Sequence, residues 1–140
     1  MVKMNLSDVV VSDYIVDLWA PLNSEQREFL SSHFTLQNYR KNETIYCEGE
    51  TAKHLMCLLS GKVKIFKDGV GGRSQIIRMI KSVEYFGYRA YFAKEEYLTA
   101  AATVEPSLIC MIPMTAIMTL VTQNSDIAMF FIRQLSVDLG

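Results

Sequence analysis

The feature that most constrains this chain is a series of short apolar segments, each ended by a turn signal, between Leu36 and Ile112. Apolar and charged residues alternate in the segment 62–67, Lys-Val-Lys-Ile-Phe-Lys, as in a strand with one buried face. Turn signals recur at intervals of roughly ten residues, the spacing of an all-β domain. The pattern predicts a mainly β, antiparallel fold, a β-barrel or jelly roll.

The expected strands are short, and about seven or eight of them are predicted. Glycine supplies the positive φ that their tight turns require. The clearest strand segments are 44–48, 54–59, 62–67, 75–81, 99–105 and 107–112. The turns expected between strands are Gly49-Glu50, Ser60-Gly61, residues 68–72 and Glu105-Pro106.

Helices are expected on both sides of the strands. A first helix is predicted over 12–19, and a second begins at Asn23 with Gln26 in a capping-box position and runs to about His33. After the strands, a short helix is predicted over 114–121. A last helix follows, with Ser125 as its N-cap.

The last helix carries an apolar seam. Its residues lie 4, 3 and 4 positions apart, the spacing of a helix that packs against a partner helix: Ala128, Ile132, Leu135 and Leu139. Because Ile127, Met129, Phe130 and Phe131 make other sides apolar too, the barrel is expected to cover one face and a second subunit another. A single wide core face is the alternative.

Charge and cysteine content exclude several classes of protein. Lys and Arg total 14 against 15 for Asp and Glu, without a clustered basic face, so DNA binding by this segment alone is not expected. The three cysteines form no C-x-x-C pair, and buried free thiols are expected at Cys47 and Cys110. No run approaches transmembrane length and residues 1–5 begin no signal peptide, so a soluble, cytoplasmic protein without a membrane partner is expected.

Four short motifs in a fixed order carry a family resemblance. They are Glu48-Gly49-Glu50, the segment 59–65, Phe86-Gly87 and Ala102-Thr103-Val104. Together they resemble the sensor domain of the Crp/Fnr transcription regulators, in which the last two motifs form the phosphate-binding cassette. The resemblance implies a jelly roll (double-stranded β-helix) over residues 1–124 and the start of a dimerisation helix over 125–140. It also implies a helix-turn-helix domain beyond residue 140, with DNA and RNA polymerase as its partners, and a homodimer.

The cassette departs from the family where anion chemistry is needed. Tyr88 stands in place of the usual Glu, Ala100 and Ala101 in place of Arg and Ser or Thr, and Val83 in place of a glycine. A phosphate without its ion pair in a partly buried pocket loses several kcal/mol. Cyclic AMP is therefore not the expected ligand.

The resemblance also implies the positions of an effector pocket: Ile65, Ile77, Arg78, Phe86, Gly87, Tyr88, Arg89, Ala90, Ala100 and Ala101. Arg78 and Arg89 are either substitute anion ligands or solvated surface charges. The surrounding aromatic residues either close an apolar pocket or fill it.

The effector itself stays unknown. An iron–sulfur cluster needs about four thiolates and is not expected. Haem is possible, with His33, His54, Cys57 or a methionine as nominal ligands, and so is an anionic metabolite. No metal site, catalytic residue or P-loop pattern is evident, so the chain is not expected to be an enzyme. A stand-alone ligand-binding or interaction domain is the alternative function.

Overall fold

The structure is a computed structural model and describes residues 10–139. Its helices are 3-10 turns at Val11–Asp13 and Val70–Gly72, α1 (Val16–Trp19), α2 (Ser24–Ser31), α3 (Arg89–Ala93), α4 (Met114–Gln123) and α5 (Ser125–Leu139). Its strands are β1 (Thr35–Tyr39), β2 (Thr44–Tyr46), β3 (His54–Asp68), β4 (Ser74–Ile80), β5 (Tyr85–Phe86) and β6 (Ala100–Pro113).

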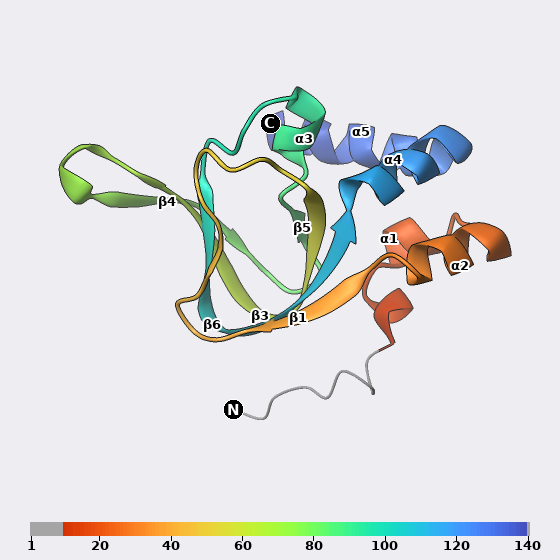
Figure 1. Cartoon of the computed structure of the whole chain (residues 1–140), viewed down its shortest axis with the longest axis horizontal. Coiled ribbons are helices and arrows are strands. Elements are labelled where there is room, and N and C mark those ends of the chain that lie inside the picture. Colours follow the sequence, from red (N-terminus) through yellow and green to blue (C-terminus); the bar gives the residue numbers. More distant parts are fainter. Residues whose placement is uncertain (1–9, 140) are drawn as a thin grey trace.

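Within the described residues the strands form one six-stranded sheet in which every pairing is antiparallel. Its order is β1-β6-β3-β4, while β2 pairs with β6 and β5 pairs with β3. Figure 1 shows the long strands β3 and β6 curving so that the sheet folds over on itself without closing. The expected jelly-roll architecture is thereby confirmed, with helices at one end.

Two predicted turns are wrong, because they are bends inside long strands. Ser60-Gly61 lies within β3 and Glu105-Pro106 within β6, and the register of the pair shifts between them. Gly61 has a φ of +103°, and a Cβ there would lie 2.6 Å from the Cα of Ser107. The irregularity is a bulge that bends both strands at one place, so four predicted strands merge into two.

Two apolar clusters fill the fold. One lies between the sheet and the helices and includes Ile112, Ile117 and Leu120 together with Ile127, Phe130 and Phe131 of α5. The other lies inside the folded sheet and includes Leu58, Val63, Ile80, Ala101 and Ile109. The helix α5 is thus held to the sheet by one buried face.

Side chains cap the starts of α2 and α5. The capping box is confirmed, since the backbone N–H of Gln26 donates to Asn23 and that of Asn23 donates to Gln26. The helix predicted over 12–19 is instead divided into a 3-10 turn, Val11–Asp13, and the short helix α1. Ser125 is not the N-cap of α5, because the N–H of Asp126 donates to the side chain of Asn124 at 3.0 Å.

The cysteines divide into one exposed and two buried thiols. The prediction for Cys47 is wrong, because this residue is exposed beside Glu50, whereas Cys57 and Cys110 are buried and lie directly opposite each other on β3 and β6. Burial raises the pKa of both buried thiols to about 12. Within residues 10–139 no helix is long and apolar enough to span a membrane. The predictions for residues 1–5 lie outside the described part.

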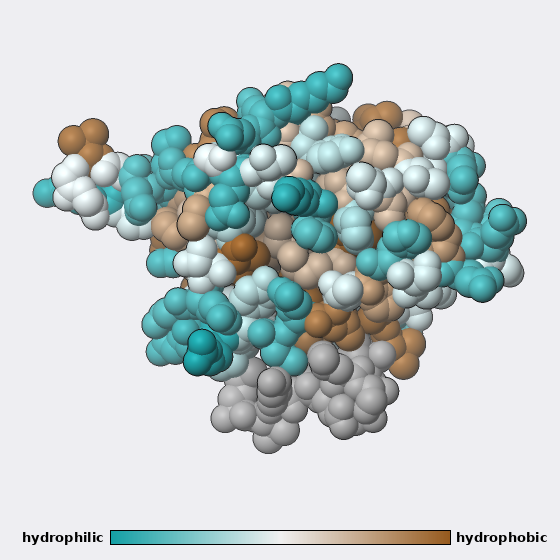
Figure 2. Space-filling view, viewed as in Figure 1, coloured by the Kyte–Doolittle hydropathy of each residue, from teal (hydrophilic) through white to brown (hydrophobic). Residues whose placement is uncertain are grey.

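Figure 2 shows hydrophilic and apolar side chains interspersed over the visible face, with the β3–β4 hairpin projecting at the left. This hairpin contains Val70, which is 99% exposed. β4 is an edge strand, and its residues Ile76 and Ile77 are both more than half exposed. The tip of the hairpin is therefore exposed, whereas its base, with Val63 and Ile80, belongs to the second apolar cluster.

Candidate functional site

A cavity of about 610 Å³ lies where the resemblance places the effector pocket. Ile65, Ile77, Arg78 and the whole run 86–90 line it. Ala100 and Ala101 do not. The remaining lining residues were not predicted as site residues: Tyr46, Tyr97, Leu98, Thr99, Val137 and Asp138.

The backbone of the cassette's first half is held by a tyrosine. Gly87 has a φ of +83°, which glycine adopts without strain, and its carbonyl accepts a hydrogen bond from the Tyr97 hydroxyl at 2.8 Å. The Tyr97 ring stacks on Tyr46 with centroids 3.7 Å apart. Burial raises the pKa of both phenols, that of Tyr46 to about 12, so both are neutral at physiological pH.

Tyr88 turns toward the last helix. It is 2% exposed, and its hydroxyl donates to Asp138 Oδ2 of α5 at 2.8 Å. Its ring meets Phe131, also on α5, edge to face at 5.8 Å. Burial, and after it the hydrogen bond to Asp138, raises the pKa of Tyr88. The position at which the family carries a carboxylate is therefore occupied by a phenol that binds one.

Both arginines of the pocket are already paired with carboxylates. Arg78 Nη1 lies 3.6 Å from Asp138 Oδ1, and its Nη2 lies 3.5 Å from Glu84 Oε2. Arg89 Nη1 lies 3.3 Å from Glu95 Oε1, and its side chain is 56% exposed. Arg78 is thus tied to α5, whereas Arg89 forms a surface pair beside α3.

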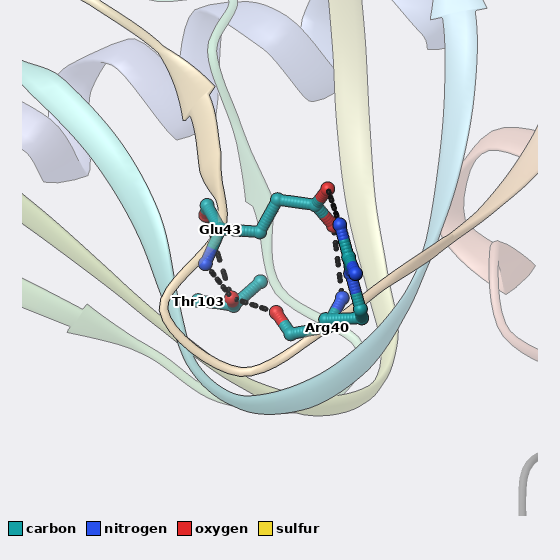
Figure 3. Close-up of polar contacts among 3 residues, drawn as sticks. All are labelled: Arg40, Glu43 and Thr103. Carbon is teal, nitrogen blue, oxygen red and sulfur yellow. Dashed lines mark hydrogen bonds and ion pairs between the residues drawn. The ribbon is translucent and has the colours of Figure 1, made fainter.

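The cassette's second half packs into the sheet. Ala100 and Ala101 are buried opposite Phe66 and Ile65 of β3. Thr103 is fully buried, and Figure 3 shows its hydroxyl between two residues of the turn that joins β1 and β2. That hydroxyl donates to the carbonyl of Arg40 and accepts from the N–H of Glu43 at 2.9 Å. The hydroxyl of Thr103 therefore stabilises the turn between β1 and β2.

Val83, at the family's glycine position, keeps the backbone conformation of a glycine. Its φ is +73°, a left-handed value that is costly for a β-branched residue, and its side chain is 48% exposed. Its N–H donates to the carbonyl of Leu58 at 2.6 Å, which holds the turn against β3. The turn therefore has a left-handed residue at this position although the residue is a valine.

A second, more open cavity of about 960 Å³ lies between α3 and α4, lined in part by Ala52, Tyr91, Phe92 and Met118. Met118 is a nominal haem ligand at this cavity. The two histidines and Cys57, the remaining nominal ligands, lie outside both cavities. His33 bonds the carbonyl of Phe29 through Nδ1, Cys57 is buried in the core, and His54 begins β3. Neither cavity includes one of these three residues, and within residues 10–139 no group of three metal-binding side chains occurs.

The predicted seam of α5 is only partly exposed. Ile132 is 53% exposed, Ala128 is half-buried, and Leu135 packs against the core cluster. The side chain of Leu139 lies outside the described part. Sequence reasoning missed Asp138 as a pocket residue, because it meets Tyr88 across 50 positions and no local pattern marks such a pair.

Comparison with known proteins identifies the family. The profile of the cyclic nucleotide-binding domain matches residues 36–124. A cGMP-dependent protein kinase of Toxoplasma gondii is 31% identical over 96 residues, 69% of this chain and 9% of the kinase. An uncharacterized protein of Haemophilus influenzae is 28% identical over 100 residues, which is 71% of this chain and 77% of that protein. The Thermus thermophilus cyclic AMP receptor protein is 26% identical over 88 residues, 63% of this chain and 41% of that protein. The chain therefore spans a small part of the kinase and less than half of the receptor.

Solved structures agree. The sensor domain of the transcriptional regulator DNR from Pseudomonas aeruginosa superposes with a TM-score of 0.81 at 23% identity, covering 92% of this chain and 88% of that one. The Thermus thermophilus catabolite activator protein gives 0.75 at 22% identity, over 88% of this chain and 58% of that one. The expected likeness to Crp/Fnr sensor domains is thereby confirmed. The jelly-roll fold, the cassette frame and the family match together show that this chain belongs to the cyclic nucleotide-binding domain family.

Proposed function

We propose that the chain is the effector-sensing domain of a Crp/Fnr-like, dimeric transcription regulator whose pocket has lost the chemistry for cyclic nucleotides. One observation carries this proposal: Tyr88 fills the carboxylate position and bonds Asp138, while Ala100 and Ala101 are buried in the sheet outside the cavity. A cyclic nucleotide then lacks the acceptor for its ribose hydroxyl, and both arginines of the pocket are already paired with carboxylates. The role proposed is regulatory and not enzymatic.

The dimer would form through α5. One face of this helix is buried by Ile127, Phe130 and Phe131, while Met129 and Ile132 remain 44% and 53% exposed. A helix that is apolar on more than one face needs more than one partner. Occupancy of the cavity would shift α5, because Val137 and Asp138 both line it, and so bias the dimer. A helix-turn-helix domain beyond residue 140, with DNA and RNA polymerase as partners and a cytoplasmic location, is part of this proposal.

Two measurements test this function. Sedimentation should show a dimer for the wild-type chain and a monomer for Ile132→Glu, while the control Arg133→Glu, on the same helix but outside the seam, stays dimeric. A dimeric Ile132→Glu variant would contradict the α5 interface. Saturating cyclic AMP should leave the Tm unchanged, whereas a ligand at a hundred times its Kd adds about 2.7 kcal/mol of stability. A large rise in Tm would contradict the loss of nucleotide chemistry.

A stand-alone ligand-binding or interaction domain is the second candidate. The match to the Haemophilus influenzae protein supports it, because it covers 77% of that protein and leaves little room for a further domain.

The α3–α4 cavity, with Met118 beside Tyr91 and Phe92, is the place where a haem-based sensor would be sought. A Soret band that appears when haem is added to the wild-type chain and is lost in Met118→Leu would support haem sensing. If no Soret band appears, the chain is not a haem sensor.

A further inference from the structure

The donor groups of the pocket already hold a carboxylate that belongs to the chain itself. Asp138 Oδ2 accepts from the Tyr88 hydroxyl at 2.8 Å, and Asp138 Oδ1 lies 3.6 Å from Arg78 Nη1. The two oxygens of one carboxylate thus face two donors from separate elements, β4 and the residue before α3. Two contacts to one planar group give geometric specificity as well as attraction.

This contact can exchange with another anion. The side chains of Arg78 and Asp138 are 42% and 20% exposed, and Arg78 divides its charge between Asp138 and Glu84. Ion pairs at this level of exposure are weak and are screened by salt. Tyr88, in contrast, is buried and packed on Phe131, so its hydroxyl stays in place when its acceptor changes.

The cavity beside Asp138 has room for an apolar body. Its volume of about 610 Å³ lies in the range of small-molecule sites. Its walls include Ile65, Ile77, Phe86 and Leu98, with the stacked pair of Tyr46 and Tyr97. A ligand with one carboxylate and an apolar remainder matches both the donors and the walls.

We propose that Asp138 is an internal competitor in this pocket, and that the effector is a small organic carboxylate that replaces it on Tyr88 and Arg78. The inference rests on the proposed role of the cavity as the effector site. Because Asp138 belongs to α5, its replacement frees the last turn of the helix through which the dimer would form. The pocket and the dimer helix are therefore coupled by exchange of one carboxylate for another.

The test is an NMR titration of the ¹⁵N-labelled chain with benzoate, which combines a carboxylate with an apolar ring. Asp138→Ala should bind benzoate about tenfold more tightly than the wild type, about 1.4 kcal/mol, because the competitor is gone. The double variant Tyr88→Phe with Asp138→Ala should lose this gain. Asp126→Ala, at the opposite end of α5, is the matched control and should bind as the wild type does.

Hydrogen exchange provides an independent readout. Benzoate should speed the exchange of amides 135–138 in the wild type and leave amides 127–131 unchanged, since only the end of α5 is released. Asp138→Ala should show the faster exchange without benzoate. Dispersed amide spectra establish that each variant is folded.

The possible failures are distinct. If the wild type and Asp138→Ala bind benzoate with equal affinity, or if Asp138→Ala does not bind it, Asp138 is not a competitor of the ligand. Preferential binding of inorganic phosphate in a parallel titration would overturn the carboxylate class. Benzyl alcohol bound as tightly as benzoate would do the same. Tight binding of cyclic AMP would instead overturn the proposed function.

Discussion

Residues 85–90 and residues 100–104 form the two halves of one cassette, yet they face different surroundings. The first half lines a cavity and reaches α5 through Tyr88. The second half is buried in the ladder, and its Thr103 clamps the turn between β1 and β2. The second half serves the packing of the sheet, whereas the first half lies at the wall of the cavity in which the proposed effector would bind. The residues of one family motif can therefore differ in role, because those of the second half hold the fold and those of the first half line the cavity.

The largest expected effect is on the strand pair that carries the second half. Gly61→Ala should lower the free energy of unfolding by about 3 kcal/mol, because left-handed backbone strain adds to overlap with Ser107. Urea unfolding measures it. Gly71→Ala is the matched control, since Gly71 has a φ of +78° but open space around it, and should cost about 1 kcal/mol. Equal losses for the two variants would show that the bulge tolerates a side chain.

Thr103→Val should cost about 2 kcal/mol, because it removes the hydroxyl that bonds both Arg40 and Glu43 and leaves their backbone groups unpaired. Thermal unfolding should show this loss without any change in ligand binding. The exposed Thr122→Val is the control and should be nearly neutral. A Thr103→Val variant that is stable but binds ligands differently would place the second half in the pocket.

Two buried thiols, those of Cys57 and Cys110, should make the free energy of unfolding decrease at alkaline pH. The thiols of Cys57 and Cys110 have an ordinary pKa of 9.0, which burial raises to about 12. Between these values the unfolded chain loses protons that the folded chain keeps, so stability is complete below pH 9 and falls above it. From pH 9 to 10 the loss is about 1 kcal/mol per thiol.

Urea unfolding at pH 8, 9 and 10 measures this slope, and the double variant Cys57→Ala with Cys110→Ala should flatten it. An unchanged slope in that variant would assign the alkaline loss to other groups. Ellman's reagent at pH 8 should modify Cys47 alone in the folded chain, because the other two thiols are buried.

The smallest effect has the opposite sign. Val83→Gly should stabilise the protein by about 1 kcal/mol, because a φ of +73° strains valine and suits glycine. Val70→Gly, at a fully exposed residue without a positive φ, should give no such gain. Differential scanning calorimetry compares the two. A destabilised Val83→Gly variant would show that the valine side chain has a packing role.

Local sequence patterns predicted most of the fold. The capping box at Asn23 is found in the structure. Residues 62–67 lie in a strand as predicted, but their burial does not alternate, because only Val63 among them is buried and residues 64–66 are all half-buried. The strand count was wrong because Gly61 and Pro106, which usually mark turns, form one bulge between two paired strands. Local signals do not distinguish a turn from a bend whose partner lies 45 residues away.

The site was predicted less completely than the fold. The family frame placed Arg78 and residues 86–90 at the cavity, but it also placed Ala100 and Ala101 there, which are buried within the sheet and do not line it. The contact of Tyr88 with Asp138 depends on how α5 packs across the sheet, which single-residue patterns do not encode. Substituted family positions therefore need their new partners to be located in three dimensions.

An amide chemical-shift titration of the wild-type chain with cyclic AMP tests the central claim most directly, because it monitors the two halves of the cassette separately. If the frame is kept without nucleotide chemistry, the amides of 86–90 and of 100–104 should not shift at concentrations that saturate cyclic AMP-binding members of the family. Saturable shifts in both halves would show that the cassette still binds a cyclic nucleotide, and would contradict the account.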